Sequence, residues 1–308
     1  MDDGSRAYVL TDLIGPVAIG DRVVVNMTAV DLGLGTGGWH VVHWNLSRDE
    51  WSQPGGGHVL KLRYTSLQAD TGVAEETHAD DLPSGLDDLP VVICDLHSQA
   101  GWVAAAFAAA APGRRLVYVM TDSAALPLAL SDLMAEVRGH GLVAATVTAG
   151  QAFGGDYEAV NVPSGLLVGR LVRADAIVVA PGPGTVGTGT RLGYGSLDAT
   201  ATIDAVTGLG GRAIVAVRYS DADPRARHRG VSHHTRTALG LANSAAWVPY
   251  PSGAAPPDAF GGRHRLVPVD VRAIDIDVTS MGRGREEDRD FSAWSAAAGV
   301  LAARMLSA

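Results

Sequence analysis

From residue 90 onward, short apolar runs alternate with longer segments of helical pattern, and this alternation constrains the fold more than any other feature. The apolar runs lie at residues 91–94, 115–120, 142–148, 176–180 and 212–217. The helical segments between them lie at residues 98–111, 126–138, 166–172 and 198–209. Strands that alternate with helices are joined by right-handed crossovers into a parallel sheet, and wholly apolar strands are typical of a sheet covered on both faces. The sequence therefore predicts an α/β fold with a mostly parallel, doubly wound (Rossmann-like) sheet.

The two ends of the chain depart from this pattern. Residues 1–68 contain short runs of β-branched and aromatic residues between glycine-rich turns, which predicts a small β-rich, barrel-like unit. Residues 69–89 are polar and acidic and predict a linker or surface loop. The α/β domain is then expected to occupy residues 90–308, with an edge strand at 265–269 and a closing helix at 290–306.

Composition excludes several classes of protein. The chain has 308 residues, 47% of them hydrophobic, which is enough for a large core. Its net charge of −9, from 24 basic and 33 acidic residues, argues against nucleic acid or an anionic membrane as partner. Cys94 is the one cysteine, so no disulfide can form within the chain and no paired-cysteine metal site exists. It lies in an apolar run and is expected to be a buried small side chain.

No targeting or membrane segment is evident. Residues 1–5 lack the basic and apolar parts of a signal peptide, and the alanine-rich run at 103–111 is too short to cross a bilayer. We therefore expect a cytoplasmic protein. The sequence leaves homo-oligomerisation open.

Polar residues follow each predicted strand at the point where it ends. The carboxyl ends of parallel strands meet at one edge of a sheet, and ligands of open α/β sheets bind beyond that edge, so we expect these residues to line one site. They are Asp95, His97 and Ser98 after the first strand, Asp122 and Ser123 after the second, residues 150–158 after the third, residues 180–190 after the fourth and residues 221–234 after the fifth. A flexible, charged loop at 280–288 is expected to be a plain surface loop, and the alternative is that it closes over this edge, with Arg283 reaching the ligand.

The loop at residues 180–190 is one candidate for binding an anion. Its sequence is Ala-Pro-Gly-Pro-Gly-Thr-Val-Gly-Thr-Gly-Thr, and a glycine-rich turn after a buried strand exposes backbone N–H groups. It lacks the lysine of a P-loop and the spacing of a dinucleotide-binding turn, and a purely structural turn is the alternative. We expect the ligand contacts to come from this loop and from two arginines further along the chain: Gly184, Gly187, Thr188, Gly189, Thr190, Arg225 and Arg229.

The segment at residues 221–234 carries the most chemistry. It holds three histidines, two aspartates and three arginines, which are costly to bury unpaired. Three interpretations stay open: a solvated basic loop, phosphate binding by Arg225, Arg227 and Arg229 with a histidine as acid or base, and ligation of a divalent metal ion. In a strand, neighbouring side chains point to opposite faces, so at most one of its last two histidines is expected to enter the site unless the segment turns.

The same segments supply the candidate metal ligands and catalytic groups. For a divalent metal ion, we expect Asp95, His97 and His234 as ligands. An aspartate after a strand is also a common helix cap, and this is the alternative for Asp122. The expected catalytic residues are His97, Asp122, Asp156, His228 and His233.

Several motifs together resemble a known family. They are residues 32–38, Tyr118-Val-Met-Thr-Asp122, Gly150-Gln-Ala-Phe-Gly-Gly-Asp156, residues 182–190, Arg227-His-Arg-Gly-Val-Ser-His-His234 and residues 280–284. This combination resembles an uncharacterised bacterial family catalogued as domain of unknown function 3866, over most of the chain. The resemblance implies a further strand ahead of the N-terminal unit, but it implies no activity and no substrate. It supports the choice of segments.

The sequence thus predicts an enzyme, a hydrolase or group transferase, that acts on a phosphorylated or nucleotide-like small molecule at the carboxyl ends of the strands. A divalent metal ion is the cofactor that the histidines and aspartates suggest. The alternative is a non-catalytic sensor that binds a nucleotide or similar anion with the same residues and signals through the β-rich unit.

Overall fold

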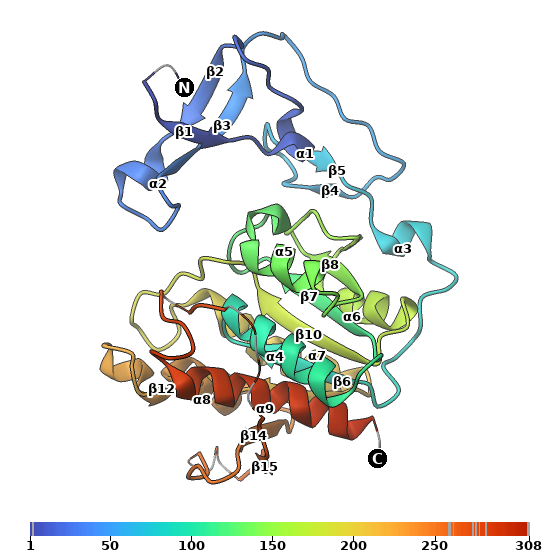
Figure 1. The fold of residues 1–308 in the computed structure, drawn as a ribbon. Coiled ribbons are helices and arrows are strands. Elements are labelled where there is room, and N and C mark those ends of the chain that lie inside the picture. Colours follow the sequence, from blue (N-terminus) through green and yellow to red (C-terminus); the bar gives the residue numbers. More distant parts are fainter. Residues whose placement is uncertain are drawn as a thin grey trace. The chain divides into compact units, whose positions relative to one another are not determined.

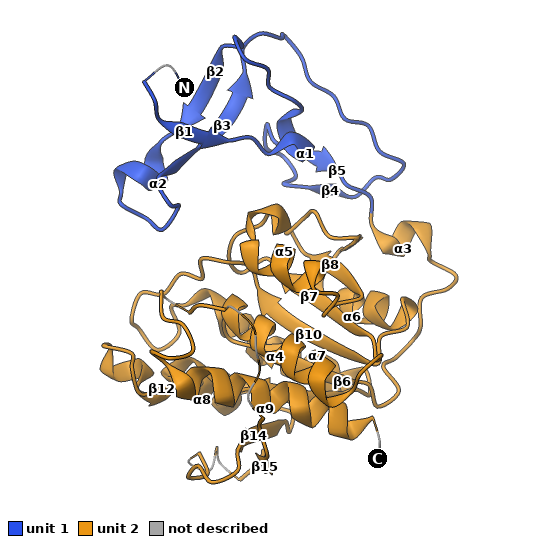
Figure 2. Ribbon diagram, in the orientation of Figure 1, with its two compact units in different colours: residues 1–72 blue, residues 73–308 orange. Residues whose placement is uncertain are grey.

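The computed structural model describes residues 1, 3–257, 260, 262–272, 274, 276, 278–280 and 282–306. The chain divides into two compact units, Met1–Gly72 and Val73–Ala308, which are coloured separately in Figure 2. Each unit has its own β-sheet, and each is described by itself.

The N-terminal unit is built on a three-stranded sheet. Its strands β1 (Arg6–Tyr8), β2 (Val23–Asn26) and β3 (Trp39–Asn45) lie in the order β1-β3-β2. The central strand β3 pairs parallel with β1 and antiparallel with β2. A two-stranded ribbon of β4 (Leu60–Lys61) and β5 (Ala69–Asp70) and the short helices α1 (Thr11–Ile14) and α2 (Thr28–Asp31) complete the unit. The small β-rich unit expected from the sequence is confirmed.

The second unit contains an eight-stranded sheet in which every pairing is parallel. The strand order is β15-β14-β11-β6-β10-β7-β8-β9 (Figure 1). The strands are β6 (Pro90–Cys94), β7 (Leu116–Thr121), β8 (Ala145–Ala149), β9 (Tyr157–Ala159), β10 (Ala176–Pro181), β11 (Arg212–Ala216), β14 (Trp247–Pro251) and β15 (Arg265–Val269). The predicted α/β class with a Rossmann-like parallel sheet is confirmed.

Helices cover both faces of this sheet, and the strands separate two cores. One face is covered by α4 (His97–Ala110), α5 (Asp132–Gly139) and α9 (Arg289–Met305), and the other by α6 (Val162–Leu171), α7 (Ala199–Gly208) and α8 (His233–Leu241). In β6, Val92 and Cys94 pack in the first core, and Val91 and Ile93 pack in the second. Because side chains alternate along a strand, a strand between two cores is apolar at every position. Burial raises the pKa of the Cys94 thiol, which acts here as a small apolar side chain.

The direction in which strands are added reverses beside β6. From β6 the chain moves outward through β7, β8 and β9, and it then returns to place β10 between β6 and β7. From β10 it continues to the other side through β11, β14 and β15. The connections that leave β6 and β10 therefore run in opposite directions. In open α/β sheets, the crevice at such a reversal is where ligands bind.

Residues 73–89, which the sequence assigns to the linker, pack onto the α/β unit. The short helix α3 (Ala74–Thr77) brings the Glu75 carboxylate to the beginning of α6, where it accepts hydrogen bonds from the Val160 N–H (2.8 Å) and the Ser164 hydroxyl. Leu86 is buried in the core shared with β6. This stretch therefore makes structural contacts ahead of the first strand of the sheet.

The sequence pattern does not predict β14, because Pro249 and Pro251 interrupt it. Proline has no N–H to give to a β-ladder and is confined to incomplete or edge pairings. β14 pairs with β15 along its length, but with β11 only between Trp247 and Ile214. Both prolines thus lie after Trp247, the one residue of β14 that pairs with β11.

The helix expected at 126–138 begins later than predicted. One 3₁₀ turn (Leu128–Leu130) comes first, and the Ser131 hydroxyl then accepts a hydrogen bond from the Met134 N–H (2.9 Å). This cap starts α5 at Asp132.

Helices α4 and α9 pack unusually close together because small residues line their contact. An added Cβ at Gly299 of α9 would collide with the Val103 carbonyl oxygen and lie 2.9 Å from the Ala106 Cβ. The alanine-rich run predicted to be too short for a membrane is therefore one side of a helix–helix contact.

Replacing Gly299 with Ala should destabilise the protein by about 1–3 kcal/mol, because the new methyl group meets backbone that cannot move freely. As a matched control, Gly240→Ala lies at an exposed position of α8 with no atom within 4 Å of its added Cβ. It should stabilise the protein by up to about 1 kcal/mol. Urea denaturation followed by tryptophan fluorescence measures both, and equal effects of the two variants would contradict the close contact.

Candidate functional site

A hollow of about 390 Å³ lies where the segments after β6, β10 and β11 meet. We call it the arginine recess, and its lining residues are Leu96, His97, Ser98, Leu133, Pro183, Gly184, Thr185, Val186, Gly187, Gly189, Arg218, Arg225, Arg227, His228, His234, Thr279 and Ser280. It lies at the reversal between β6 and β10, as the topology leads us to expect.

Three arginines line the arginine recess. Arg218 follows the end of β11 and is only 4% exposed, and its Nη1 donates to Nδ1 of His234 (3.0 Å). Arg225 is held by Asp223, whose two carboxylate oxygens accept from its Nε (2.9 Å) and Nη2 (2.8 Å). Arg227 is exposed and makes no hydrogen bond or ion pair with any residue that the structure describes. The guanidinium of Arg218 is therefore buried, that of Arg225 is held by an ion pair, and that of Arg227 is free to contact a ligand.

The buried carboxylate of Asp223 orders this side of the recess. It lies 3.4 Å from Nη2 of Arg283 and 3.8 Å from Nη2 of Arg218, in addition to its paired contact with Arg225. Burial alone would raise the pKa of Asp223, but the hydrogen bonds and charge of Arg225 outweigh it and hold the pKa well below its ordinary value. Arg283, for which a ligand contact is the alternative interpretation, is engaged with Asp223 and Asp288. Met281 of the same loop lies outside the described residues.

The segment at 221–234 turns, and the turn brings its histidines together. β12 (Tyr219–Ser220) pairs antiparallel with β13 (Gly230–Val231), and α8 begins directly afterwards. The Ser232 hydroxyl accepts from the His234 N–H (3.2 Å) and so caps this helix. The strand-like alternation of the last two histidines therefore does not apply. One ligand atom from each of three histidines lies within 4.8 Å of the others: His228, His233 and His234.

Burial and the neighbouring arginines keep these histidines neutral. Burial, followed by the charges of Arg218 and Arg225, lowers the pKa of His228 to about 3. Burial and the Arg218 charge also lower the pKa of His234, and burial with the Arg227 charge lowers that of His233. A neutral imidazole can accept a proton or donate one hydrogen bond, so all three rings are suited to contact an anion at neutral pH.

The spacing of the three histidines would also suit a metal ion, but their surroundings favour an anion. Arg218 donates to Nδ1 of His234, so that nitrogen is already used as an acceptor. A dication would also meet the guanidinium groups of the recess at close range. Of the three expected metal ligands, only His234 belongs to this group of three histidines.

The other two expected metal ligands have separate partners. Asp95 is 2% exposed and accepts a hydrogen bond from the Thr235 hydroxyl. Burial raises the pKa of Asp95 to about 6, although the Thr235 hydrogen bond and the Arg218 charge oppose the shift. This carboxylate lies beneath the site, between β6 and α8.

Both ring nitrogens of His97 are occupied. Its Nδ1 lies 3.0 Å from the Pro181 carbonyl oxygen, which can only accept, so Nδ1 carries the proton. The Ser131 hydroxyl then donates to Nε2 (2.6 Å). Burial lowers the pKa of His97 to about 4, which keeps this tautomer neutral. The ring lines the recess and ties the end of β10 to the first turns of α4 and α5.

Six further predicted residues do not line the arginine recess: Asp122, Asp156, Thr188, Thr190, Arg229 and His233. The Asp122 carboxylate accepts from the Gln151 N–H (2.8 Å) and orders the turn after β8. Asp156 is paired with Arg138 (2.7 Å) and accepts from Thr146 at the beginning of β8, away from the carboxyl ends of the strands. Arg229 donates to the Asp223 carbonyl oxygen (3.1 Å).

The loop after β10 borders the recess with its backbone. The Thr188 and Thr190 hydroxyls lie 2.9 Å apart and also bond to the backbone of Gly193, so both threonines hold the shape of the loop. Gly189 has a φ of 82°, a conformation that favours glycine, and its backbone passes the Arg227 guanidinium. The glycines of the loop line the recess as expected: Gly184, Gly187 and Gly189.

Sequence reasoning did not select Arg218 or Tyr194. The Tyr194 ring stacks on His234 (3.8 Å between centroids, 4° between planes), and its hydroxyl donates to the His234 carbonyl (3.0 Å). Arg218 had a usable signal, since a charged residue directly follows the apolar run at 212–217. Tyr194 had none, because only the fold brings it to α8.

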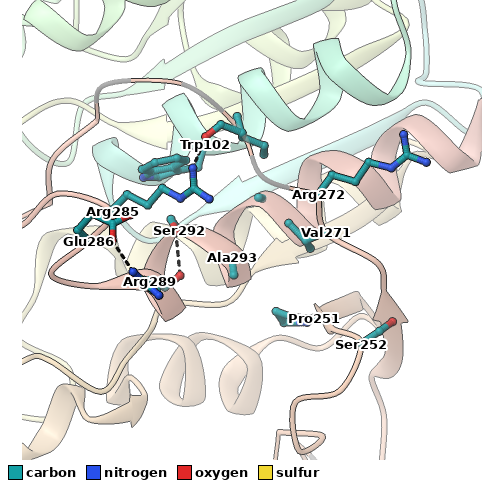
Figure 3. Close-up of a pocket in the computed structure, with 12 residues that line it drawn as sticks. Trp102, Pro251, Ser252, Val271, Arg272, Arg285, Glu286, Arg289, Ser292 and Ala293 are labelled. Carbon is teal, nitrogen blue, oxygen red and sulfur yellow. Dashed lines mark hydrogen bonds and ion pairs between the residues drawn. The ribbon is translucent and has the colours of Figure 1, made fainter.

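A second hollow, of about 430 Å³, lies between α4 and the beginning of α9 (Figure 3). Arg272, Arg285 and Arg289 line it. Arg289 is paired with Glu286, however, and Arg285 donates to the Ile274 carbonyl (3.1 Å). No residue of the loops directly after β6 and β10 and no described histidine lines it, so the arginine recess is the candidate functional site.

Comparison with known proteins identifies the family. Residues 6–299 match the family described as "Protein of unknown function (DUF3866)", and the chain belongs to this family. The match confirms the resemblance carried by the motifs. Searches of curated proteins and of solved structures return no match. None of the helices in the described part of the chain combines the length and apolar character needed to cross a bilayer.

Replacing Asp95 with Asn should stabilise the protein at pH 8 but not near pH 4. Because the folded-state pKa of about 6 exceeds the unfolded value of about 3.9, ionising Asp95 in the folded protein costs about 3 kcal/mol. The cost is absent well below pH 4, where both states are protonated, grows between about pH 4 and pH 6, and stays constant above pH 6. Free energies of unfolding from urea titrations at several pH values measure it.

The exposed carboxylate of Asp270, with 84% of its side chain accessible, provides the control. Asp270→Asn should show no such trend with pH. A stabilisation by Asp95→Asn that did not vary with pH would rule out a buried charge as its cause.

Proposed function

We propose that this protein binds a small phosphorylated molecule in the arginine recess and catalyses its hydrolysis or a group transfer from it. The observation that carries the proposal is the meeting of three guanidinium groups and three neutral histidines at the reversal of the strand order. The nearest carboxylate, Asp223, is buried and committed to Arg225.

The charge of the recess supports an anionic ligand. Guanidinium groups offer paired N–H donors that match phosphate oxygens, and such charge-assisted hydrogen bonds are stronger than neutral ones. Burial lowers the pKa of Arg218 to about 10, so this side chain still carries its charge at neutral pH. No aspartate or glutamate lines the recess among the described residues. A phosphate would therefore meet the guanidinium of Arg227, which has no acidic partner among the described residues.

His228 supports a reaction beyond binding. Its ring is neutral at physiological pH, and it can take a proton from a water or hydroxyl as that oxygen bonds to phosphorus. A bound dianion raises the pKa of a neighbouring imidazole, so the ring can hold this proton. The oxygen of the P–O bond that breaks then leaves with the rest of the ligand and receives a proton in return. His233, whose ring centroid lies 5.0 Å from that of His228, is the second candidate for this transfer.

One observation favours the alternative of a non-catalytic sensor. The aspartates expected to assist catalysis all have protein partners: Asp95 with Thr235, Asp122 with Gln151 and Asp156 with Arg138. A site without a free carboxylate can bind phosphate and release it unchanged. The separate N-terminal unit would then be the part that passes on the signal.

Replacing Arg227 with Ala should weaken phosphate binding by about tenfold or more, because a charge-assisted contact is lost. Arg227 makes no hydrogen bond or ion pair in the described structure, so its loss leaves the fold intact. Calorimetric titration with inorganic phosphate measures the dissociation constant. Arg212→Ala, at the opposite, amino-terminal end of β11, removes the same charge and should change it little. An equal effect of both variants would count against a site at the recess.

Replacing His228 with Asn should lower turnover by about 100- to 10,000-fold while leaving binding nearly unchanged. Ligands are first found by thermal shift with a panel of nucleotides and sugar phosphates, and turnover is then followed as released phosphate. His140→Asn, on the exposed end of α5, is the control and should retain full activity. Ligand binding without turnover in the wild type would favour the sensor.

A further inference from the structure

A different cationic hollow, of about 400 Å³, adjoins the arginine recess. We call it the Arg191 hollow, and its lining residues are Gly189, Arg191, Arg227, His233, Arg236 and Thr237. Gly189 and Arg227 line both hollows. The two are therefore neighbours across the side chain of Arg227.

The Arg191 hollow gathers three guanidinium groups from separate parts of the chain. Arg191 comes from the loop after β10, Arg227 from the turn before β13, and Arg236 from α8. Among the described residues, no aspartate or glutamate lines the Arg191 hollow. Arg191 and Arg227 are exposed and make no hydrogen bond or ion pair with a described residue, so an anion bound between them would be stabilised by both charges.

The histidines join the two hollows. His228 lines the arginine recess, His233 lines the Arg191 hollow, and ligand atoms of the two rings lie within 4.8 Å of each other. Nε2 of His233 is buried and has no hydrogen-bond partner among the described residues. Buried polar atoms in native proteins are nearly always satisfied, so this nitrogen is suited to a ligand group beside Arg227.

We propose that the ligand carries two adjacent phosphoryl groups, as in a diphosphate or a diphosphate ester. One group occupies the arginine recess, the other occupies the Arg191 hollow, and Arg227 contacts both. The inference rests on the proposed function, because it requires the arginine recess to bind phosphate. It adds the substrate class, which neither hollow would indicate alone.

Calorimetric titration of the full chain with inorganic phosphate and with inorganic pyrophosphate tests this inference. The wild type should bind pyrophosphate at least about tenfold more tightly than phosphate. Arg191→Ala should weaken pyrophosphate binding by about tenfold and phosphate binding by less than about twofold. Arg236→Ala should show the same selective loss from a different element, and Arg212→Ala should show neither effect.

The outcomes separate this inference from the proposed function. If Arg191→Ala changes both affinities equally, or changes neither, the second phosphoryl site is overturned while the arginine recess stands. If the wild type binds neither anion, the proposed function fails and the inference with it. Because Arg236 donates to the Val231 carbonyl (3.2 Å), an unchanged affinity of its variant for phosphate shows that α8 remains in place.

Discussion

The arrangement of the site depends on the buried carboxylate of Asp223. Its two oxygens hold Arg225, and its backbone N–H donates to the Ser220 hydroxyl (3.0 Å), which in turn donates to Asp288 at the beginning of α9 (2.6 Å). Breaking a buried ion pair leaves an unpaired charge and costs several kcal/mol, so this network has one favourable arrangement. It joins the end of the sheet, the turn before α8 and the first residues of α9. The direction of the Arg225 side chain follows from it.

The sequence predicts those elements whose pattern is set by burial alone. Strands between two cores are apolar throughout, so β6, β7, β10 and β11 are evident from their composition. β14 is not evident from its sequence. Its prolines are tolerated because β14 pairs with β11 at one position only, and this incomplete pairing is a property of the folded sheet. The beginning of α8 is missed for a similar reason. A helix start that depends on one serine cap and a preceding two-residue ribbon leaves little trace in hydrophobic periodicity.

The candidate site is predictable as a place but not in its detail. Parallel strand order brings the ends of β6, β10 and β11 together, and polar residues after those strands reveal it. Which polar residues meet depends on local partners. Both ring nitrogens of His97 are hydrogen-bonded, to Pro181 and Ser131. Asp156 accepts a hydrogen bond from Thr146 at the beginning of β8, whereas the turn at Ser232 brings three histidines together. Such hydrogen bonds are decided by geometry that spacing in the sequence does not encode.

One positive field sets both the protonation of the histidines and the kind of ligand that suits them. Burial and the charges of Arg218 and Arg225 hold the pKa of His228 low, and those same charges would repel a metal ion. An anion among these groups opposes the field, and so it raises the pKa of the imidazole beside it. Binding an anion and taking up a proton are therefore coupled at this site. A phosphorylated ligand would therefore help the neutral histidine beside it to hold a proton that it takes up.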